Sequence, residues 1–295
     1  MTMKTTRTLL RTLIQHRRAA IVPGAFNALS ARVIEDLGFE AIYVTGAGIS
    51  NMWLGLPDLG FIGLTDVAQH TARIRDAVSL PLIVDADTGF GNAINVYQTV
   101  RTLERAGADC IQIEDQVNPK RCGHFAGKDV ITLNEAVDKI KAAVDARHDA
   151  DLLIMARTDA AAVHGFDAAV ERAQRFAEAG ADILFVEALT QLDQLQALPR
   201  HVQAPLLMNM VIGGKTPIAS TENLADWGYS LVLYANAALQ GAVAGMQKAL
   251  QTLQQQKQLD ESSGLVVSFA ERQRLVNKSF WDSLEHQYTG SQLSS

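Results

Sequence analysis

The sequence is poor in several features that would tie it to particular environments. It has two cysteines among 295 residues, and aromatic residues make up only 6% of the chain. Cys110 and Cys122 lie on opposite sides of a predicted strand end, so we expect no disulfide between them and a reducing compartment. No apolar run approaches the length of a membrane span, and the basic first residues lack the apolar core of a signal peptide. We therefore expect a cytoplasmic protein without a membrane partner.

Positive charge is also scarce. The chain has 26 Lys and Arg against 32 Asp and Glu, a formal net charge of −6 at pH 7. Proteins that bind nucleic acid or anionic membranes through charge present a basic surface, so we expect no nucleic-acid partner. Apolar residues, in contrast, make up 48% of the chain, which is enough for a large core.

A short phrase recurs along the chain, in which a helix ends near a glycine and an apolar strand follows. It occurs at residues 36–46, 105–115, 178–188 and 226–236. Four further apolar strands with other approaches are predicted at residues 19–25, 80–87, 151–158 and 204–210. Amphipathic helices such as 133–146 lie between the strands, and eight such units predict an α/β fold of the (β/α)8 TIM-barrel type. The alternative, an open doubly wound sheet, would need a Gly-rich phosphate turn after the first strand, and residues 22–28 are not one.

The chain continues beyond the eighth predicted strand. A helix is predicted over residues 238–258, and a second helical stretch ends at residues 280–288. We predict that residues 1–250 form the barrel and that residues 251–295 form a helical extension for subunit packing. The extension carries Phe280, Trp281 and Tyr288, and aromatic side chains are enriched in interfaces. The sequence therefore favours a homo-oligomer.

Polar residues gather at the ends of the predicted strands. Alternate residues of a barrel strand point inward, and active sites form at the carboxyl ends. The inward residues predicted at these ends are Tyr43, Thr45, Asp85, Asp87, Glu114, Arg157, Glu187 and Asn209. Three carboxylates in one place need a cation, and oxygen ligands with few protein groups favour Mg2+. A structural salt-bridge cluster is the alternative explanation for these charges.

A long polar segment follows the strand at residues 110–114, before Thr132 and Glu135 begin the next predicted helix as a capping box. Connections of this length in α/β units are usually lids or binding loops. The segment places a thiol among cations in five consecutive residues: Lys120, Arg121, Cys122, Gly123 and His124. Neighbouring cations lower a thiol pKa, which predicts a reactive Cys122. An incidental cysteine in a basic loop is the alternative.

Four motifs give the chain a resemblance to a known family: VDADTGFGN, IEDQVNPKRCGH, MARTDA and NMVIGGKTP. From about residue 20 to 250 the chain resembles the isocitrate lyase / phosphoenolpyruvate mutase superfamily, and its KRCGH element resembles the methylisocitrate lyase and 2,3-dimethylmalate lyase branches. The resemblance implies a carbon–carbon lyase that uses Mg2+, with Mn2+ as an alternative, to cleave a 2-hydroxy di- or tricarboxylate. It also implies a homotetramer in which the last helix is exchanged between subunits. A carboxyphosphonoenolpyruvate phosphonomutase-like enzyme, an oxaloacetate-acting enzyme and a non-catalytic metabolite-binding barrel are the alternatives.

The resemblance implies roles for individual residues. The metal would be held, partly through water, by Asp58, Asp85, Asp87 and Glu114. The catalytic residues would be Tyr43, Lys120, Cys122, His124 and Arg157, with Cys122 as the general acid. The substrate would be bound by Thr45, Gly46, Ala47, Arg121, Gly123, Glu187, Asn209 and Thr216. Gln112 stands where some lyases carry His, and Ile212 where many relatives carry Glu, which leaves the exact substrate open.

Overall fold

The computed structural model describes residues 5–121, 127–214 and 216–289, and within them eight strands close into a parallel barrel. The strands follow one another around the barrel in chain order, and β1 pairs with β8 to close it. They are β1 (Ala20–Ala25), β2 (Ile42–Val44), β3 (Leu82–Asp85), β4 (Cys110–Glu114), β5 (Leu153–Thr158), β6 (Ile183–Val186), β7 (Leu206–Asn209) and β8 (Leu231–Tyr234). The predicted TIM barrel is confirmed, and the open-sheet alternative is wrong.

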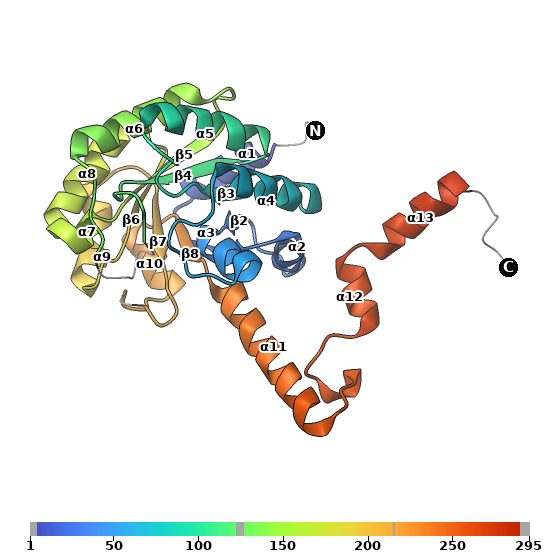
Figure 1. The fold of residues 1–295 in the computed structure, drawn as a ribbon. Helices are drawn as coiled ribbons and strands as arrows, with labels where there is room; N and C mark the ends of the chain where they lie inside the picture. The colour runs from blue at the N-terminus through green and yellow to red at the C-terminus, as the bar shows by residue number, and fades with distance from the viewer. Residues whose placement is uncertain (1–4, 122–126, 215, 290–295) are drawn as a thin grey trace. The chain divides into compact units, whose positions relative to one another are not determined.

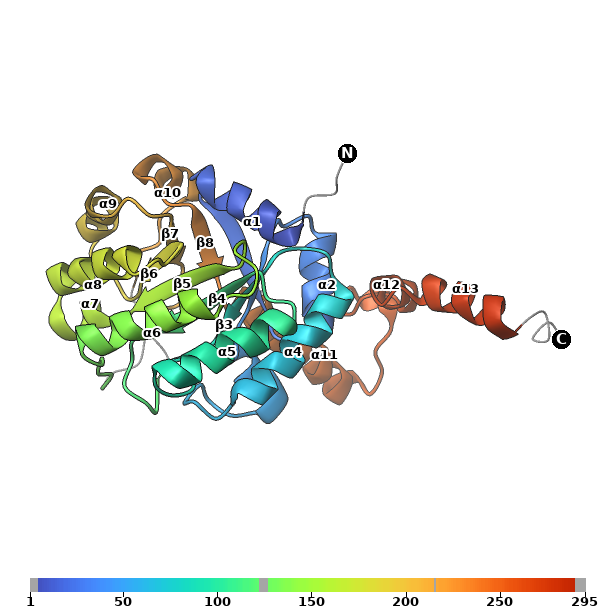
Figure 2. The same ribbon diagram turned by 90° about the horizontal axis from the view of Figure 1, so that it is seen from above.

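Helices alternate with the strands and surround them, as Figures 1 and 2 show. The helices of the barrel unit are α1 (Thr6–Gln15), α2 (Ala28–Asp36), α3 (Gly46–Ile49), the π-helical turn η1 (Ser50–Leu54), α4 (Leu64–Ala77), α5 (Ala93–Arg105), α6 (Leu133–Ala146), α7 (Ala160–His164), α8 (Phe166–Glu178), α9 (Leu192–His201) and α10 (Thr221–Trp227). The predicted helix over residues 133–146 is α6. Its N-cap is Thr132, whose hydroxyl accepts a hydrogen bond from the backbone N–H of Glu135 at 3.3 Å.

Apolar side chains form two clusters, one on each side of the barrel wall. The larger cluster fills the space between the strands and the surrounding helices. The smaller one lies inside the barrel and includes Ile83, Leu153 and Phe185. Leu10 and Ile14 of α1 belong to this inner cluster, so α1 covers the amino-terminal end of the barrel. The carboxyl end is therefore the end left available for a site, as in other TIM barrels.

Part of the recurring sequence phrase has a structural explanation at the amino-terminal end. Asp109 and Asp182 occupy the same place in two copies of the phrase, immediately before β4 and β6. The Asp109 carboxylate accepts a hydrogen bond from the backbone N–H of Leu82, and Asp182 accepts one from Ile154, at 2.8 and 2.9 Å. Each aspartate thus fixes the start of a neighbouring strand and satisfies a backbone donor there.

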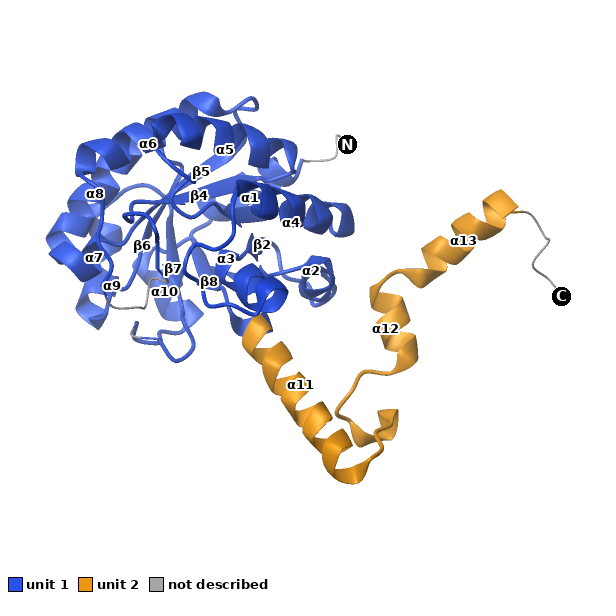
Figure 3. Ribbon diagram, in the orientation of Figure 1, with its two compact units in different colours: residues 1–238 blue, residues 239–295 orange. Residues whose placement is uncertain are grey.

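The chain divides into two compact units, residues 1–238 and residues 239–295 (Figure 3). The second unit contains most of α11 (Ala237–Gln256), the 3-10 turn η2 (Glu261–Ser263), α12 (Phe269–Leu275) and α13 (Lys278–Thr289). Within α13 the rings of Phe280 and Trp281 meet edge to face with centroids 5.4 Å apart, and both side chains are exposed. The assignment of residues 251–295 to subunit packing stays a prediction. Across the described ranges, no helix has both the length and the apolar surface needed to cross a membrane.

Candidate active site

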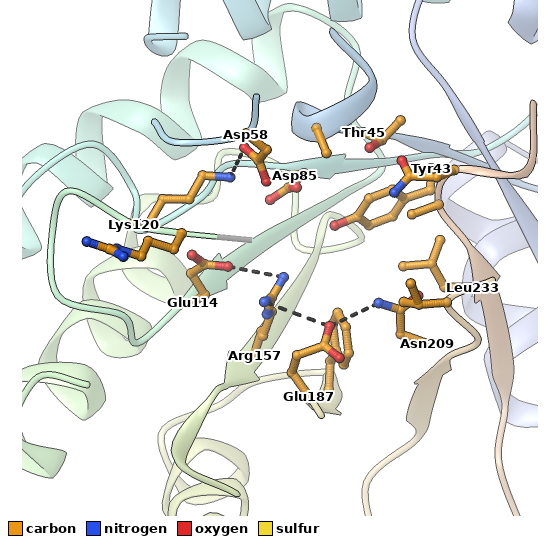
Figure 4. A pocket seen from close by; sticks show the side chains of 16 residues that line it. Tyr43, Thr45, Asp58, Asp85, Glu114, Lys120, Arg157, Glu187, Asn209 and Leu233 are labelled. Atoms are coloured by element: carbon orange, nitrogen blue, oxygen red, sulfur yellow. Dashed lines mark hydrogen bonds and ion pairs between the residues drawn. The ribbon is translucent and has the colours of Figure 1, made fainter. Parts of the chain in front are cut away.

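A pocket lies at the carboxyl end of the barrel, where the ends of the strands meet the segments that follow β2 and β4 (Figure 4). Its lining residues are Tyr43, Thr45, Ala47, Asp58, Asp85, Glu114, Lys120, Arg121, Arg157, Phe185, Glu187, Asn209, Val211, Leu233, Ala235 and Asn236. Of the predicted site residues that the structure describes, Gly46, Asp87 and Thr216 are not among these. The structure therefore brings together side chains that the sequence separates by more than 160 positions.

Two carboxylates on one side of the pocket share a buried lysine. Lys120 Nζ is 2.8 Å from Asp87 Oδ1 and also donates a hydrogen bond to Asp58 Oδ1. Asp87 is only 4% exposed, and this burial raises its pKa to about 7, although the nearby Lys120 opposes the change. Burial alone would lower the pKa of Lys120, but Asp87 and Asp58 outweigh it, so the pKa is raised and the lysine is a cation. One positive charge thus serves two acids.

Arg157 organises the other side of the pocket. Its NH1 group is 3.2 Å from Glu114 Oε2, its NH2 group is 3.8 Å from Glu187 Oε2, and its guanidinium lies over the Phe185 ring. Asn209 donates a hydrogen bond to Glu187 at 2.9 Å, which continues the chain of contacts to β7, as the dashed lines in Figure 4 show. Burial raises the pKa of Glu114 well above its usual value, and Arg157 only partly opposes it.

Arg157 also pairs with a buried aspartate, Asp159, that the sequence prediction did not include. Asp159 accepts hydrogen bonds from both Nε and NH2 of Arg157, at 2.9 and 3.1 Å, so the pair is bidentate. It also pairs with Lys128 Nζ at 2.6 Å, and its backbone N–H donates to Asp115 at 2.9 Å. The sequence does contain a signal, since Asp159 follows Arg157 by two residues just as Asp87 follows Asp85.

Tyr43 is connected to Asp85 by hydrogen bonds through the Gln112 side chain. Its hydroxyl donates a hydrogen bond to Gln112 Oε1 at 2.7 Å, and Gln112 Nε2 donates to Asp85 Oδ1 at 3.0 Å. The backbone N–H of Asp87 donates to the same Asp85 oxygen at 3.1 Å. Burial, reinforced by the charge of Asp85, raises the pKa of Tyr43 well above its usual value, so the phenol is neutral at neutral pH.

The turn after β2 brings the backbone close to the carboxylates. Thr45 caps α3 by accepting a hydrogen bond from the backbone N–H of Gly48 at 3.2 Å. A Cβ atom added at Gly46 would lie 3.4 Å from Asp85 Oδ2 and 3.5 Å from Asp87 Oδ1. A side chain at position 46 would therefore occupy space directly beside both acids. Thr216, predicted as a substrate ligand, is buried and does not line the pocket.

The described residues of the long segment after β4 make contacts with one another. The Gln116 side chain exchanges two hydrogen bonds with the backbone of Arg121, both at 2.9 Å. Gln116 also forms an antiparallel bridge with Val130, which pairs the outgoing and returning arms of the segment. Three predicted site residues, Cys122, Gly123 and His124, lie outside the described residues.

The donor atoms of the pocket fit a hard divalent cation. Among the residues with described positions, Asp87 Oδ1 and Glu114 Oε1 are buried without a hydrogen-bond partner, although Lys120 forms an ion pair with Asp87. Buried oxygen acceptors of this kind suit Mg2+, which takes one or two carboxylates and keeps several waters. Within the same residues, no three His, Cys, Asp or Glu side chains are arranged to hold a metal by themselves. The buried oxygens are compatible with a hydrated cation, and a Mg2+ held by Asp58, Asp85, Asp87 and Glu114 partly through water stays a prediction.

The pocket lining also includes four apolar residues that the sequence prediction did not include. They are Phe185, Val211, Leu233 and Ala235. Phe185 and Leu233 also belong to the cluster inside the barrel, and an apolar residue in a barrel strand is expected in the core. The sequence therefore holds no signal that separates these two residues from ordinary packing.

Comparisons with known proteins agree with this geometry. A family model described as phosphoenolpyruvate phosphomutase matches residues 10–254. A 2-methylisocitrate lyase of Aeropyrum pernix is 53% identical over 226 residues, 77% of this chain and 72% of that protein. A 2,3-dimethylmalate lyase of Eubacterium barkeri is 40% identical over 282 residues, which are 95% and 96% of the two chains.

Solved structures resemble the whole chain. A crystal structure of 2,3-dimethylmalate lyase has a TM-score of 0.91 and 34% identity, covering 99% of this chain and 98% of that one. A phosphonopyruvate hydrolase in complex with oxalate and Mg2+ has a TM-score of 0.87 and 28% identity, covering 97% and 99%.

Proposed function

The chain belongs to the phosphoenolpyruvate phosphomutase family, and on this premise we propose that it is a carbon–carbon lyase acting on a 2-hydroxy di- or tricarboxylate. The products would be an α-oxo acid and a second carboxylate. The observation that carries the proposal is a pocket in which buried oxygen acceptors lie beside two cations, Lys120 and Arg157. Relatives with this fold that cover most of the chain are named lyases.

The pocket residues have distinct tasks in this proposal. Arg157, Glu187 and Asn209 bind one end of the substrate, since they form a continuous chain of polar contacts across β5, β6 and β7. The backbone amides of Gly46 and Ala47 bind the α-oxo-acid half, with Thr45 beside them in the same turn. Charge that develops as the carbon–carbon bond breaks is stabilised by cations that are already in place, which is usually the largest contribution to catalysis.

The reaction begins when a base takes the proton of the substrate hydroxyl. The electron pair left on oxygen forms a carbonyl, the carbon–carbon bond breaks, and its electrons stay on the leaving fragment as a carboxylate-stabilised carbanion. We propose that the Cys122 thiol then donates its proton to this carbon, with Lys120, Arg121, Gly123 and His124 as its neighbours in the sequence.

We propose Mg2+ as the metal, with Mn2+ as a substitute, held by Asp85, Asp87, Glu114 and Asp58 partly through water. When bound, such a cation supplies positive charge to the oxygen atoms of the substrate and of the α-oxo product. Lys120 compensates part of the acidic charge from the side.

A substrate panel tests this function. The chain is incubated with Mg2+ and 2-methylisocitrate, 2,3-dimethylmalate, further 2-alkylmalates or oxaloacetate, and release of the α-oxo acid or other product is followed. We expect turnover of at least one of the 2-hydroxy acids. Turnover of oxaloacetate alone, or of a phosphonate in a parallel assay, would replace the lyase with one of the other reactions of the family. Binding without any turnover would favour a metabolite-binding barrel.

We further propose a homotetramer in which the C-terminal helix is exchanged between subunits. The support is the exposed aromatic set of α13, Phe280, Trp281 and Tyr288, since such residues are typical of interfaces. Removal of residues from 262 onward should lower both the particle mass in light scattering and the thermal midpoint. A truncated chain of unchanged particle size would contradict this assembly.

A further inference from the structure

Gln112 is a polar side chain in an apolar place. It lies in the middle of β4, is fully buried, and has Cys110 of the inner cluster two positions before it on the same strand. Burying an amide costs free energy unless its donors and acceptors are satisfied. The two hydrogen bonds of Gln112, to Tyr43 and to Asp85, provide that compensation.

The chemistry of the two partners fixes the direction of both hydrogen bonds. Asp85 Oδ1 is a carboxylate oxygen that already accepts from a backbone N–H, so it faces the amide nitrogen of Gln112 as an acceptor. The amide oxygen of Gln112 must then face Tyr43. Two oxygen atoms 2.7 Å apart need a hydrogen between them, and only the Tyr43 hydroxyl can supply it.

The single hydroxyl proton of Tyr43 is therefore used in the hydrogen bond to Gln112. Tyr43 lines the pocket, and Figure 4 shows its oxygen pointing toward the centre of the labelled side chains. A phenol oxygen that has given away its proton can still accept a hydrogen bond but cannot donate one.

We infer that Gln112 is a positioning residue that makes Tyr43 an acceptor toward the ligand, so that the site selects a 2-hydroxy acid over the corresponding 2-oxo acid. The inference rests on the proposed function and deepens it. A ligand hydroxyl can donate to the Tyr43 oxygen, whereas an oxo oxygen would meet it as a second acceptor without a hydrogen between them. The same arrangement holds the substrate hydroxyl better than the product carbonyl, which favours product release.

The test is an equilibrium measurement on the full chain with Mg2+. Malate and oxaloacetate differ at C2 only in hydroxyl versus oxo, and the ratio of their dissociation constants is measured by calorimetry with the tighter-binding malate enantiomer. We expect the parent chain to bind malate more tightly. Gln112→Met keeps the side-chain length but frees the Tyr43 proton to donate to the ligand. The preference for malate over oxaloacetate, measured as the ratio of their dissociation constants, should therefore fall by about five- to tenfold, the usual effect of one hydrogen bond.

Two further variants make the result decisive. Gln98→Met makes the same change on the exposed surface of α5 and should leave the ratio unchanged. Tyr43→Phe should bring the ratio close to one, and adding Gln112→Met to it should change nothing more. If circular dichroism shows that Gln112→Met does not fold, Tyr43→Phe alone carries the test.

Equal or tighter binding of oxaloacetate by the parent, no malate binding, or a ratio in Gln112→Met within twofold of the parent would overturn the inference. Where that variant does not fold, a Tyr43→Phe ratio like that of the parent overturns it. The test measures binding and not turnover. A chain that cleaves no acid of the panel but keeps this preference would refute the proposed lyase and leave the role of Gln112 standing. A chain that cleaves a 2-hydroxy acid but does not bind malate more tightly than oxaloacetate would support the proposed lyase and refute the role of Gln112.

Discussion

Both ends of the barrel carry buried carboxylates, but those at the two ends differ in how many hydrogen bonds they accept from the protein. At the amino-terminal end, Asp109 accepts hydrogen bonds from the Thr6 hydroxyl at 2.6 Å and the backbone of Leu82 at 2.8 Å, and pairs with Arg75 at 3.3 Å. At the carboxyl end, Glu114 Oε1 is buried without a hydrogen bond to any described residue, and Asp87 Oδ1 is met there by the Lys120 ion pair alone.

The difference separates a structural role from a functional one. Acceptors that are satisfied within the fold contribute to stability, as at Asp109. Acceptors that are buried and incompletely satisfied cost stability, and a fold retains them where a ligand or metal completes them. Substitutions at the amino-terminal end should therefore change stability, and changes at the carboxyl end should change activity.

Removal of the metal should have the largest effect. In excess chelator, turnover should fall to the background rate, because Lys120 and Arg157 are already paired with carboxylates and cannot replace a divalent cation. Addition of excess Mg2+ or Mn2+ should restore it. The measurement is the rate of α-oxo-acid release, with chelator already saturated by Mg2+ as the control. Full turnover in metal-free chelator would show that the incompletely satisfied acids serve another purpose.

Cys122→Ser should have the next largest effect. A serine hydroxyl has nearly the size of the thiol but is a far weaker acid, so kcat should fall by about 10²–10⁴ while KM stays close to that of the parent. Cys110→Ser is the matched control for the same change at the buried cysteine of β4. It should affect stability more than kcat. A Cys122→Ser enzyme within about threefold of the parent kcat would remove this thiol from the mechanism.

The contrast between the ends also explains what the sequence could and could not predict. Strand ends and inward faces follow from the period of two and the recurring phrase, so Asp85, Glu114, Arg157 and the barrel itself were predictable. The function of Asp109 was not, and the spacing that places Asp159 two residues after Arg157 does not by itself show that the two side chains pair. Whether an acid is satisfied depends on donors that lie far away in the sequence.

Gln112 illustrates the same limit. Its position on the inward face of β4 follows from the alternation of the strand. Its task depends on Tyr43 and Asp85, which come from two other strands. The direction of a hydrogen bond between strands is a property of the assembled barrel, and no local pattern in the sequence contains it.

At the amino-terminal end, Asp109→Ala should lower stability without changing turnover. The substitution leaves the Thr6 hydroxyl and the Leu82 N–H without their acceptor and removes two ion pairs, with Arg7 and Arg75, which keep other partners. We expect a loss of about 1–3 kcal/mol in the free energy of unfolding. Urea denaturation measures it. Asp151→Ala removes an exposed acid at the same end and should change stability by no more than about 0.5 kcal/mol. A loss of kcat in Asp109→Ala, at full folding, would mean that the two ends are coupled.

The smallest expected effect is a pH-dependent one at Asp87 in the metal-free chain. An aspartate has a pKa of about 3.9 when unfolded, whereas burial raises the pKa of Asp87 to about 7 in the folded chain. Between these values the folded state holds a proton that the unfolded state has lost, so stability falls as the pH rises through this window. An asparagine at position 87 cannot ionise, so its chain does not lose this stability as the pH rises. From pH 6 to pH 7 in chelator, Asp87→Asn should therefore gain about 1 kcal/mol relative to the parent. The gain is measured as a difference in urea midpoints between variant and parent that grows with pH.

Because Asp87 is a proposed metal ligand, the same variant should lose turnover. A difference that stays constant or shrinks with pH would mean that the Lys120 ion pair satisfies Asp87 as fully as the amino-terminal contacts satisfy Asp109.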